Sequence, residues 1–267
     1  MRTLVITGGS SGIGQSTASL FAERGWRVFE LSRRDVQKDD VQSTKGEIIH
    51  ITCDVCSEES VRAAIADVLQ HTDRVDVVIS NAGFGISGPI EFTEIKEAER
   101  QMDVNFMGAV RLIQAILPQL RKQQSGRIIF TSSVAAQLAV PYQSFYSASK
   151  AAINALALAL ANEVRPFGIK VSVMMPGDVS TGFTDARSKS VNGQEIYTRA
   201  EKAVSAMEND ERNGMAPQQM ARLFYHIATC RRPRPQYVGG LMYRVLCLLD
   251  NVLPKRLVNW IEGKMYS

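Results

Sequence analysis

The feature that most restricts the fold of this sequence is the alternation of short apolar segments with longer segments of helical periodicity. The short segments are rich in Val and Ile and apolar on both faces, which is typical of parallel strands covered by helices. They are Thr3–Thr7, Arg27–Leu31, Glu47–Thr52, Val75–Ser80, Arg127–Thr131 and Lys170–Met174. The longer segments are Gly12–Arg24, Ser57–His71, Ala98–Lys122 and Phe145–Val164. This pattern predicts an α/β protein with a doubly wound parallel sheet, whose ligands bind at the carboxyl ends of the strands.

The composition is that of a globular protein with one domain. The chain has 267 residues, of which 45% are hydrophobic and 22% charged. No Pro-, Gly- or Ser-rich linker and no internal repeat divides it, so we expect residues 1–267 to form a single domain. Lysine and arginine are scattered among acidic residues. The net charge of +4 therefore does not indicate a nucleic-acid partner.

The four cysteines, Cys53, Cys56, Cys230 and Cys247, are too few for a disulfide framework in a chain of this size. Cys53 and Cys56 have CxxC spacing, but no second pair completes a metal site. We interpret all four as reduced thiols in a reducing compartment. Because the first predicted strand begins at Thr3, the N-terminus leaves no room for a signal peptide. These features predict a cytoplasmic protein without a metal.

A glycine-rich turn joins the first predicted strand to the first helix. Residues 7–14 read TGGSSGIG, which differs from the GxGxxG of many dehydrogenases. Glycines permit a tight turn and a close approach of the backbone to a pyrophosphate, whose charge the N–H groups of the helix N-terminus then bind. We predict dinucleotide contacts from Gly8, Ser10, Ser11, Gly12, Ile13 and Gly14.

The end of the second predicted strand bears on the choice of dinucleotide. NAD sites place Asp or Glu there to bind the ribose 2′-hydroxyl, whereas this chain has Ser32, Arg33 and Arg34. A guanidinium forms charge-assisted hydrogen bonds to a 2′-phosphate, so we expect NADP(H). Glu30 and Asp35 are nearby acids that leave NAD open as the alternative.

A tyrosine and a lysine one helical turn apart form the candidate proton-transfer site. Tyr146 and Lys150 share a helix face, and a neighbouring ammonium favours the phenolate and lowers the pKa of the phenol. Lys150 is also placed to bind the ribose hydroxyls of a cofactor. A serine hydroxyl at the end of the preceding strand, at Ser132 or Ser133, can donate to a substrate carbonyl as negative charge develops on its oxygen.

In combination, these motifs resemble those of the short-chain dehydrogenases/reductases, and the match extends to about residue 240. Residues 7–14 match the TGxxxGxG cofactor turn, and residues 146–150 match the YxxxK element. The resemblance adds further cofactor contacts at Asp54, Val55, Asn81, Ala82, Gly83, Pro176, Gly177, Val179 and Thr181. The family spacing selects Ser133 as the catalytic serine, and Asn105 matches the asparagine of the family's proton relay.

The resemblance implies a Rossmann fold and a reaction that interconverts a carbonyl and an alcohol. Hydride moves between the nicotinamide and the substrate carbon, while Tyr146 gives or takes the hydroxyl proton. Ser133 polarises the oxygen, Lys150 tunes Tyr146 and holds the ribose, and Asn105 anchors a water. No metal takes part, and His50, His71 and His226 lie outside the site.

The substrate side is expected in two later segments. Residues 182–215 match the family's substrate lid and read as helical fragments only. Residues 238–267 form an apolar tail of helical periodicity, too interrupted to span a membrane. Three arrangements of the tail are open: over the active-site mouth, against a membrane surface, or in a subunit interface. Similar tails in hydroxysteroid and retinol dehydrogenases favour, by analogy, a lipophilic substrate such as a steroid or retinoid.

The partner expected besides the substrate is a second copy of the chain. The helix after Tyr146 is rich in alanine, and the family forms dimers or tetramers through this helix and the one that holds Asn105. Two functions compete with the oxidoreductase: an NADP(H)-sensing binding protein without turnover, and a sugar-nucleotide epimerase or dehydratase. The sequence does not identify the natural substrate or its stereochemistry.

Overall fold

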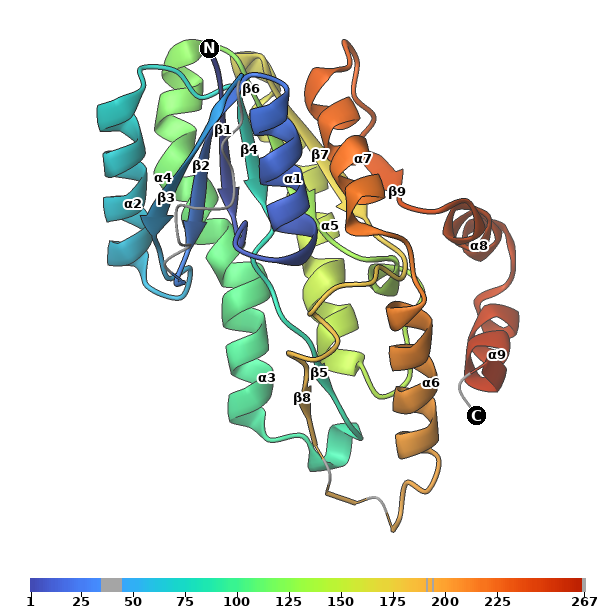
Figure 1. Ribbon diagram of the computed structural model, residues 1–267. Coiled ribbons are helices and arrows are strands. Elements are labelled where there is room, and N and C mark those ends of the chain that lie inside the picture. The colour runs from blue at the N-terminus through green and yellow to red at the C-terminus, as the bar shows by residue number, and fades with distance from the viewer. Residues whose placement is uncertain (35–44, 191, 194, 266–267) are drawn as a thin grey trace.

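The computed structural model describes residues 1–34, 45–190, 192–193 and 195–265. Within them, seven strands form one parallel sheet in the order β3-β2-β1-β4-β6-β7-β9 (Figure 1). The strands are β1 (Arg2–Thr7), β2 (Trp26–Ser32), β3 (Glu47–Thr52), β4 (Val77–Ser80), β6 (Gly126–Thr131), β7 (Ile169–Met175) and β9 (Gln236–Val238). The predicted Rossmann fold is confirmed. Strand order reverses between β1 and β4, so a crevice opens beyond their carboxyl ends.

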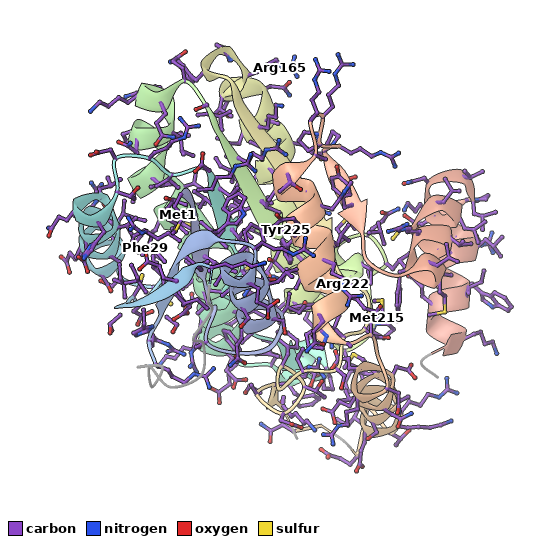
Figure 2. All side chains as sticks on the ribbon, turned by 45° about the horizontal axis from the view of Figure 1, so that its top comes forward. Met1, Phe29, Arg165, Met215, Arg222 and Tyr225 are labelled. Atoms are coloured by element: carbon purple, nitrogen blue, oxygen red, sulfur yellow. The ribbon has the colours of Figure 1, made fainter. Side chains whose placement is uncertain are left out.

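Helices cover both faces of the sheet (Figure 1). One face carries α1 (Gly12–Glu23) and α7 (Pro217–Thr229), and the other carries α2 (Glu58–His71), α4 (Gly108–Gln123) and α5 (Ser144–Glu163). On α7, Tyr225, labelled in Figure 2, meets Phe21 of α1 edge to face at 5.1 Å between ring centroids. This contact holds the two helices together over β1 and β2.

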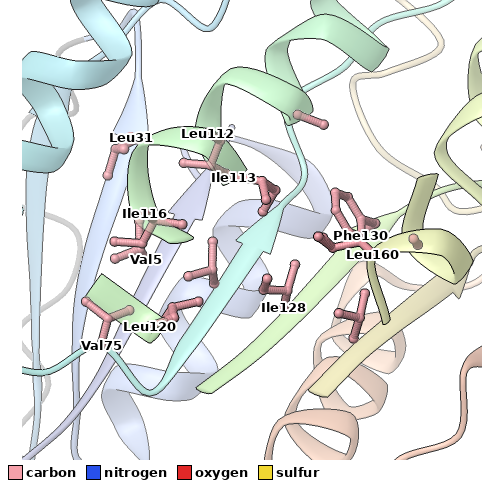
Figure 3. Close-up of a cluster of buried hydrophobic side chains, with 14 of the residues drawn as sticks. Val5, Leu31, Val75, Leu112, Ile113, Ile116, Leu120, Ile128, Phe130 and Leu160 are labelled. Atoms are coloured by element: carbon pink, nitrogen blue, oxygen red, sulfur yellow. The ribbon is translucent and has the colours of Figure 1, made fainter. Parts of the chain in front are cut away.

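The alternation of side chains along β1 divides its residues between two apolar cores. Val5 faces α2 and α4, whereas Leu4 and Ile6 face α1 and α7. Figure 3 shows the first core, in which Val5 and Ile128 of the sheet lie among Leu112 and Ile116 of α4. Burying each such side chain contributes roughly 1.5–3 kcal/mol, which fixes the register of the strands and therefore the positions of their carboxyl ends.

The single helix predicted over Ala98–Lys122 is wrong in its boundaries and its regularity. The structure has α3 (Ile95–Met102), one π-helical turn at Asp103–Met107, and then α4. The π turn takes one extra residue and shifts the helix register. Asn105 on this turn is buried, and Gly108 just after it packs on Val55, where a Cβ would come within 2.9 Å.

The lid contains more regular structure than helical fragments, and the tail forms helices. In the lid, β8 (Ser188–Lys189) pairs with β5 (Ile86–Ser87), and α6 (Ala200–Arg212) follows as a regular helix, which corrects the sequence interpretation. The tail forms α8 (Leu241–Val252) and α9 (Lys255–Met265) at the edge of the molecule beyond β9 (Figure 1). No helix in the described part of the chain has the length and apolar character that a membrane-spanning segment needs.

Candidate active site

A cavity of about 1550 Å³ lies at the carboxyl ends of the strands. It begins at the glycine turn after β1 and continues past α5 to the lid and the tail. The predicted site residues along it are Gly8, Ser10, Ser11, Gly12, Ile13, Gly14, Arg33, Arg34, Asp54, Val55, Asn81, Ala82, Gly83, Ser133, Tyr146, Lys150, Pro176, Gly177, Val179 and Thr181. Asn105 is absent from this lining. The fold thus gathers residues from six strand ends into one space.

The glycine turn has no room for a side chain at Gly14 and takes a left-handed backbone conformation at Gly12. A Cβ on Gly14 would lie 2.1 Å from the Gly8 carbonyl oxygen, and Gly12 has a φ of +55°. Ser11, the N-cap of α1, makes no side-chain capping hydrogen bond, and the first turn holds no acidic residue. The N–H groups at this helix end therefore lack a side-chain acceptor, and the turn fits the pyrophosphate of a dinucleotide.

Asn81 fastens the glycine turn to the centre of the sheet. Its Nδ2 donates to the carbonyl oxygens of Thr7 at 3.2 Å and Gly8 at 3.1 Å. Its Oδ1 accepts from Thr131 Oγ1 at 3.2 Å, and its backbone N–H donates to Thr7 Oγ1. Because these contacts join the ends of β1, β4 and β6, Asn81 fixes the position of the glycine turn relative to the sheet.

The two arginines after β2 lie beside the glycine turn. Arg34 Nη2 donates to Ser11 Oγ at 3.1 Å, and both guanidinium-bearing residues are exposed along the cavity. Glu30, in contrast to the two arginines, is not exposed. Because β2 continues to Ser32, Glu30 lies within the strand and is buried beneath Gly9. Its carboxylate lies 2.6 Å from His50 Nδ1 and accepts from Ser32 Oγ at 3.2 Å. Asp35 lies outside the described residues.

Ser133, Tyr146 and Lys150 meet where β6 ends against α5. Ser133 caps the short turn that follows β6, where its Oγ accepts from the Ala135 N–H at 3.1 Å. Lys150 Nζ donates to the Thr131 carbonyl oxygen at 3.0 Å and lies 5.8 Å from the centroid of the Tyr146 ring. The lysine and the tyrosine therefore share a face of α5, but the ammonium is bonded to β6 and not to the phenol.

The pKa of Tyr146 is shifted in the direction opposite to the one expected. Burial raises the pKa of its phenol to about 12, against the lowering effect of the hydrogen bond with Ser133. Burial also lowers the pKa of Lys150 to about 8. Desolvation penalises the charged form of each group, so at neutral pH the phenol is protonated and Lys150 is still mainly an ammonium.

The Asn105 side chain is bonded to two neighbouring segments. Its Oδ1 accepts from the Phe84 N–H at 3.0 Å, and its Nδ2 donates to the Phe84 carbonyl and to Ser149 Oγ, each at 3.0 Å. Both donor hydrogens of the side chain are thus engaged. The side chain of Asn105 anchors the segment around Gly83 and Phe84, which lines the cavity.

The lid closes one side of the site through an aromatic ring backed by buried charge. Phe183 lies against Tyr146, with 5.8 Å between the ring centroids. Behind it, the Arg187 guanidinium lies 5.7 Å from the Phe183 ring, and its Nη2 is 2.5 Å from Glu211 Oε1. The other carboxylate oxygen of Glu211 accepts from Thr184 Oγ1 at 2.7 Å. This network holds the start of the lid on α6.

The tail closes the opposite side. Tyr243 of α8 packs over Gly177 and donates a hydrogen bond to Asp178. Gln137 Nε2 donates to the Cys247 carbonyl oxygen at 2.8 Å and so fastens the middle of α8 to the body of the protein. Cavity-lining side chains from the two tail helices include Leu246, Leu253, Val258 and Ile261.

Several cavity residues were not identified from the sequence. Phe84 and Asp178 directly follow the predicted cofactor contacts Gly83 and Gly177, so their positions were available as a signal. Phe183, Glu211 and Tyr243 carry no comparable signal, because long-range packing of the lid and the tail brings them to the cavity.

Comparisons with known proteins agree with this geometry. A family model described as short chain dehydrogenase matches residues 2–192. The 3-ketodihydrosphingosine reductase of Bacteroides thetaiotaomicron is 38% identical over 99% of this chain and 97% of its own length. Retinol dehydrogenase 8 of Bos taurus is 32% identical over 95% of this chain and 86% of its own.

A solved structure agrees over the same length. The crystal structure of a short-chain dehydrogenase from Streptomyces avermitilis has a TM-score of 0.85 at 30% identity and covers 99% of this chain and 97% of its own. The family model covers six of the seven strands of the sheet, the glycine turn and the tyrosine–lysine pair, and β9 lies beyond it. The chain therefore belongs to the short-chain dehydrogenase/reductase family, whose members are oxidoreductases that act on alcohol and ketone groups with a nicotinamide cofactor.

Proposed function

We propose that this protein is an NADP(H)-dependent reductase of lipophilic carbonyl compounds, with Tyr146 as its proton donor. The observation that carries the proposal is the continuity of one cavity. It runs from the glycine turn and the arginines after β2, past Ser133 and Tyr146, to apolar side chains of the tail such as Leu246 and Leu253. A dinucleotide and a long apolar substrate can therefore meet beside the tyrosine.

Each residue has a role that follows from its position. A bound nicotinamide supplies the hydride that reduces the carbonyl carbon. The Tyr146 phenol gives the oxygen its proton, and the Ser133 hydroxyl donates a hydrogen bond that stabilises negative charge on that oxygen. Lys150 places an ammonium beside the tyrosine, where it can bind ribose hydroxyls. Asn105 acts as a positioning residue through the Phe84 backbone.

The arginines support NADP(H) over NAD(H). Arg34 is already placed across the glycine turn by its hydrogen bond to Ser11, within reach of a phosphate on the adenosine ribose. Glu30, the acid that would serve a 2′-hydroxyl, is buried and engaged with His50 and Ser32. A buried carboxylate that is already bonded to other side chains is not available to accept a hydrogen bond from the ribose 2′-hydroxyl.

The charge states at neutral pH favour the reductive direction. A phenol with its pKa raised to about 12 is protonated, which is the form that donates to a carbonyl oxygen. Alcohol oxidation requires the phenolate as a base, and burial disfavours that form. The same site can run both ways, but we expect the reduction to be faster at neutral pH.

The relatives support a lipophilic substrate. Two of them are named for a reductase of a long-chain keto base and for a retinol dehydrogenase. In this chain, the substrate end of the cavity is lined by Leu138, Val140, Met207, Leu246 and Leu253. Apolar lining with a few fixed polar groups is typical of sites for such ligands.

We also propose that the protein forms a homo-oligomer through α5. Ala148, Ala151, Ala155 and Ala159 are exposed along this helix together with Leu158. Small side chains permit close packing of helices from two copies, and the face is removed from the cavity side of the helix. Light scattering tests this: a monomeric mass would contradict it.

The test is a nicotinamide absorbance assay with NADPH and NADH against a panel of carbonyl compounds. The panel contains 3-ketodihydrosphingosine, retinal, a ketosteroid, a short soluble ketone and an aldose. We expect stoichiometric NADPH oxidation, a higher kcat/KM with NADPH than with NADH, and the highest kcat/KM for the long apolar carbonyls. Binding of NADPH without oxidation by any compound would instead indicate a dinucleotide sensor. Conversion of a sugar nucleotide without net oxidation would indicate an epimerase.

A further inference from the structure

Helix α8 carries apolar side chains on its solvent side as well as on its cavity side. Leu246 and Leu253 line the cavity. On the outer side Val245, Leu248 and Val252 recur at helical spacing, and Leu248 and Val252 are 63% and 75% exposed. In Figures 1 and 2 the helix stands at the edge of the molecule with its outer side free of other elements. An exposed apolar stripe of this kind marks a contact surface.

Helix α9 extends the same surface. Trp260 is 61% exposed and Leu257 is exposed beside it on the helix. An indole ring has an apolar body with one polar N–H group, and tryptophan is therefore enriched where a membrane meets water. Lys255 Nζ is bonded to the Asp250 carboxylate at 2.6 Å, which ties the start of α9 to α8.

The charges around this surface are mainly positive. Within residues 241–264 the basic side chains are Arg244, Lys255, Arg256 and Lys264, against the acids Asp250 and Glu262. Asp250 is buried and bonded to Lys255, so this pair contributes little net charge to the outer surface. The remaining charged side chains are Arg244, Arg256 and Lys264 against Glu262. Arg244 and Arg256 are exposed. Basic side chains beside an apolar stripe complement the headgroups of an anionic lipid surface.

The lining of the cavity reaches this surface. Leu249 of α8 and Ile261 of α9 both line the cavity and are both among the exposed apolar residues. The apolar surface of the tail is therefore continuous with the substrate end of the cavity at these two residues.

We propose that α8 and α9 bind the surface of an anionic lipid bilayer, and that lipophilic substrate enters the cavity from this bilayer between the two helices. The route of entry rests on the proposed function, whereas the lipid contact does not. A second copy of the chain is the less suitable occupant, because a two-fold interface brings each patch against itself and sets Arg244 and Arg256 among like charges.

Fluorescence of Trp260 measures the contact directly. The chain has two tryptophans, and Trp26 is only 3% exposed, so a shift of emission on adding vesicles reports Trp260. We expect a blue shift and cosedimentation with vesicles of phosphatidylcholine and phosphatidylglycerol. Vesicles of phosphatidylcholine alone should bind roughly tenfold or more weakly, and added salt should weaken the binding to anionic vesicles.

A double variant tests the apolar stripe. Leu248→Glu with Val252→Glu places two carboxylates on the outer side of α8, away from the cavity, and should reduce vesicle binding roughly tenfold or more. The matched control is Ile95→Glu on α3, where the side chain is 67% exposed and vesicle binding should not change. Reduction of a short soluble ketone should be the same in both variants and the parent protein, which separates this test from that of the proposed function.

Two results would overturn the proposal. One is the absence of both the blue shift and cosedimentation in the parent protein. The other is a dimer that light scattering finds in the parent protein and not in the double variant, with no lipid binding by either. That result would assign the patch to a second copy of the chain.

Discussion

The two ends of the chain use apolar side chains in opposite ways. In β1 near the N-terminus, Leu4, Val5 and Ile6 are completely buried, each against helices on one face of the sheet. In α8 near the C-terminus, Leu248 and Val252 are among the most exposed apolar residues of the described chain. Burial in β1 stabilises the fold and places the cofactor end of the cavity. The apolar surface of α8 contributes little to folding and is available to a ligand or a lipid surface.

The difference extends to the polar residues around the cavity. At the sheet end, Asn81 and Asn105 satisfy their amides against backbone groups of neighbouring strands and turns. At the tail end, α8 is held to the body by bonds that include Tyr243 to Asp178, Gln137 to the Cys247 carbonyl and Arg244 to the Val238 carbonyl. The polar contacts at the sheet end therefore join strands and turns of the framework to one another, whereas those at the tail end join one peripheral helix to that framework.

The largest difference between the two regions should appear when a tyrosine of each loses its hydroxyl. Tyr146→Phe removes the proton donor, and kcat should fall roughly 10²- to 10⁴-fold while NADPH binding is retained. Tyr243→Phe removes the bond to Asp178, and kcat should stay near that of the parent with a KM for a long-chain carbonyl raised a few-fold. Steady-state kinetics with a binding titration of NADPH measures both. Similar losses of kcat in the two variants would contradict the different roles assigned to Tyr146 and Tyr243.

The second largest difference between the buried core and the exposed side of α8 should appear in the free energy of unfolding. Phe130→Ala opens a cavity in the fully buried core and should lower the free energy of unfolding by about 3–5 kcal/mol. Leu248→Ala on the exposed stripe should change it by no more than about 0.5 kcal/mol. Denaturant unfolding of the two variants, analysed with a common m-value, gives the comparison. A large loss in Leu248→Ala would mean that the stripe is covered within the protein itself.

These contrasts also mark what the sequence could predict. The sheet and the placement of Tyr146, Lys150 and Ser133 follow from local patterns, because strand periodicity and glycine spacing are short-range properties. The π turn at Asp103–Met107 was missed because a few residues do not distinguish it from an α-helix. The raised pKa of Tyr146 was missed because burial, a property of the whole fold, outweighs the effect expected of its neighbour Lys150. The contact of Tyr243 with Asp178 joins distant segments and leaves no local signal.

The KM values for NADPH and NADH test the role of the arginines at the sheet end of the cavity. Arg34→Ala removes the guanidinium that we propose binds the 2′-phosphate, and it should raise the KM for NADPH about 10- to 100-fold, with little change for NADH. Arg62→Ala is the matched control, since Arg62 is exposed on α2 and paired with Glu58 away from the cavity. Equal effects of Arg34→Ala on NADPH and NADH would contradict the assignment.

The smallest expected effect is on pH dependence. Burial lowers the pKa of Lys150 to about 8, whereas Tyr146 stays protonated to about 12. Reduction uses the protonated phenol beside the ammonium, so kcat/KM should be level below pH 8 and decline above it as Lys150 loses its proton. In Lys150→Arg the guanidinium keeps its charge, and the decline should move to higher pH. An unchanged profile in that variant would assign the titration to another group.

Transfer of deuterium tests the central claim most directly. The protein is mixed with a long-chain ketone and NADPH that carries deuterium at the transferable position of the nicotinamide C4, and the alcohol is analysed by mass spectrometry. The account predicts one deuterium on the carbinol carbon of each product molecule, with the hydroxyl proton taken from solvent through Tyr146. Product without deuterium, or deuterium on that carbon only when the solvent is D₂O, would contradict direct hydride transfer in this cavity.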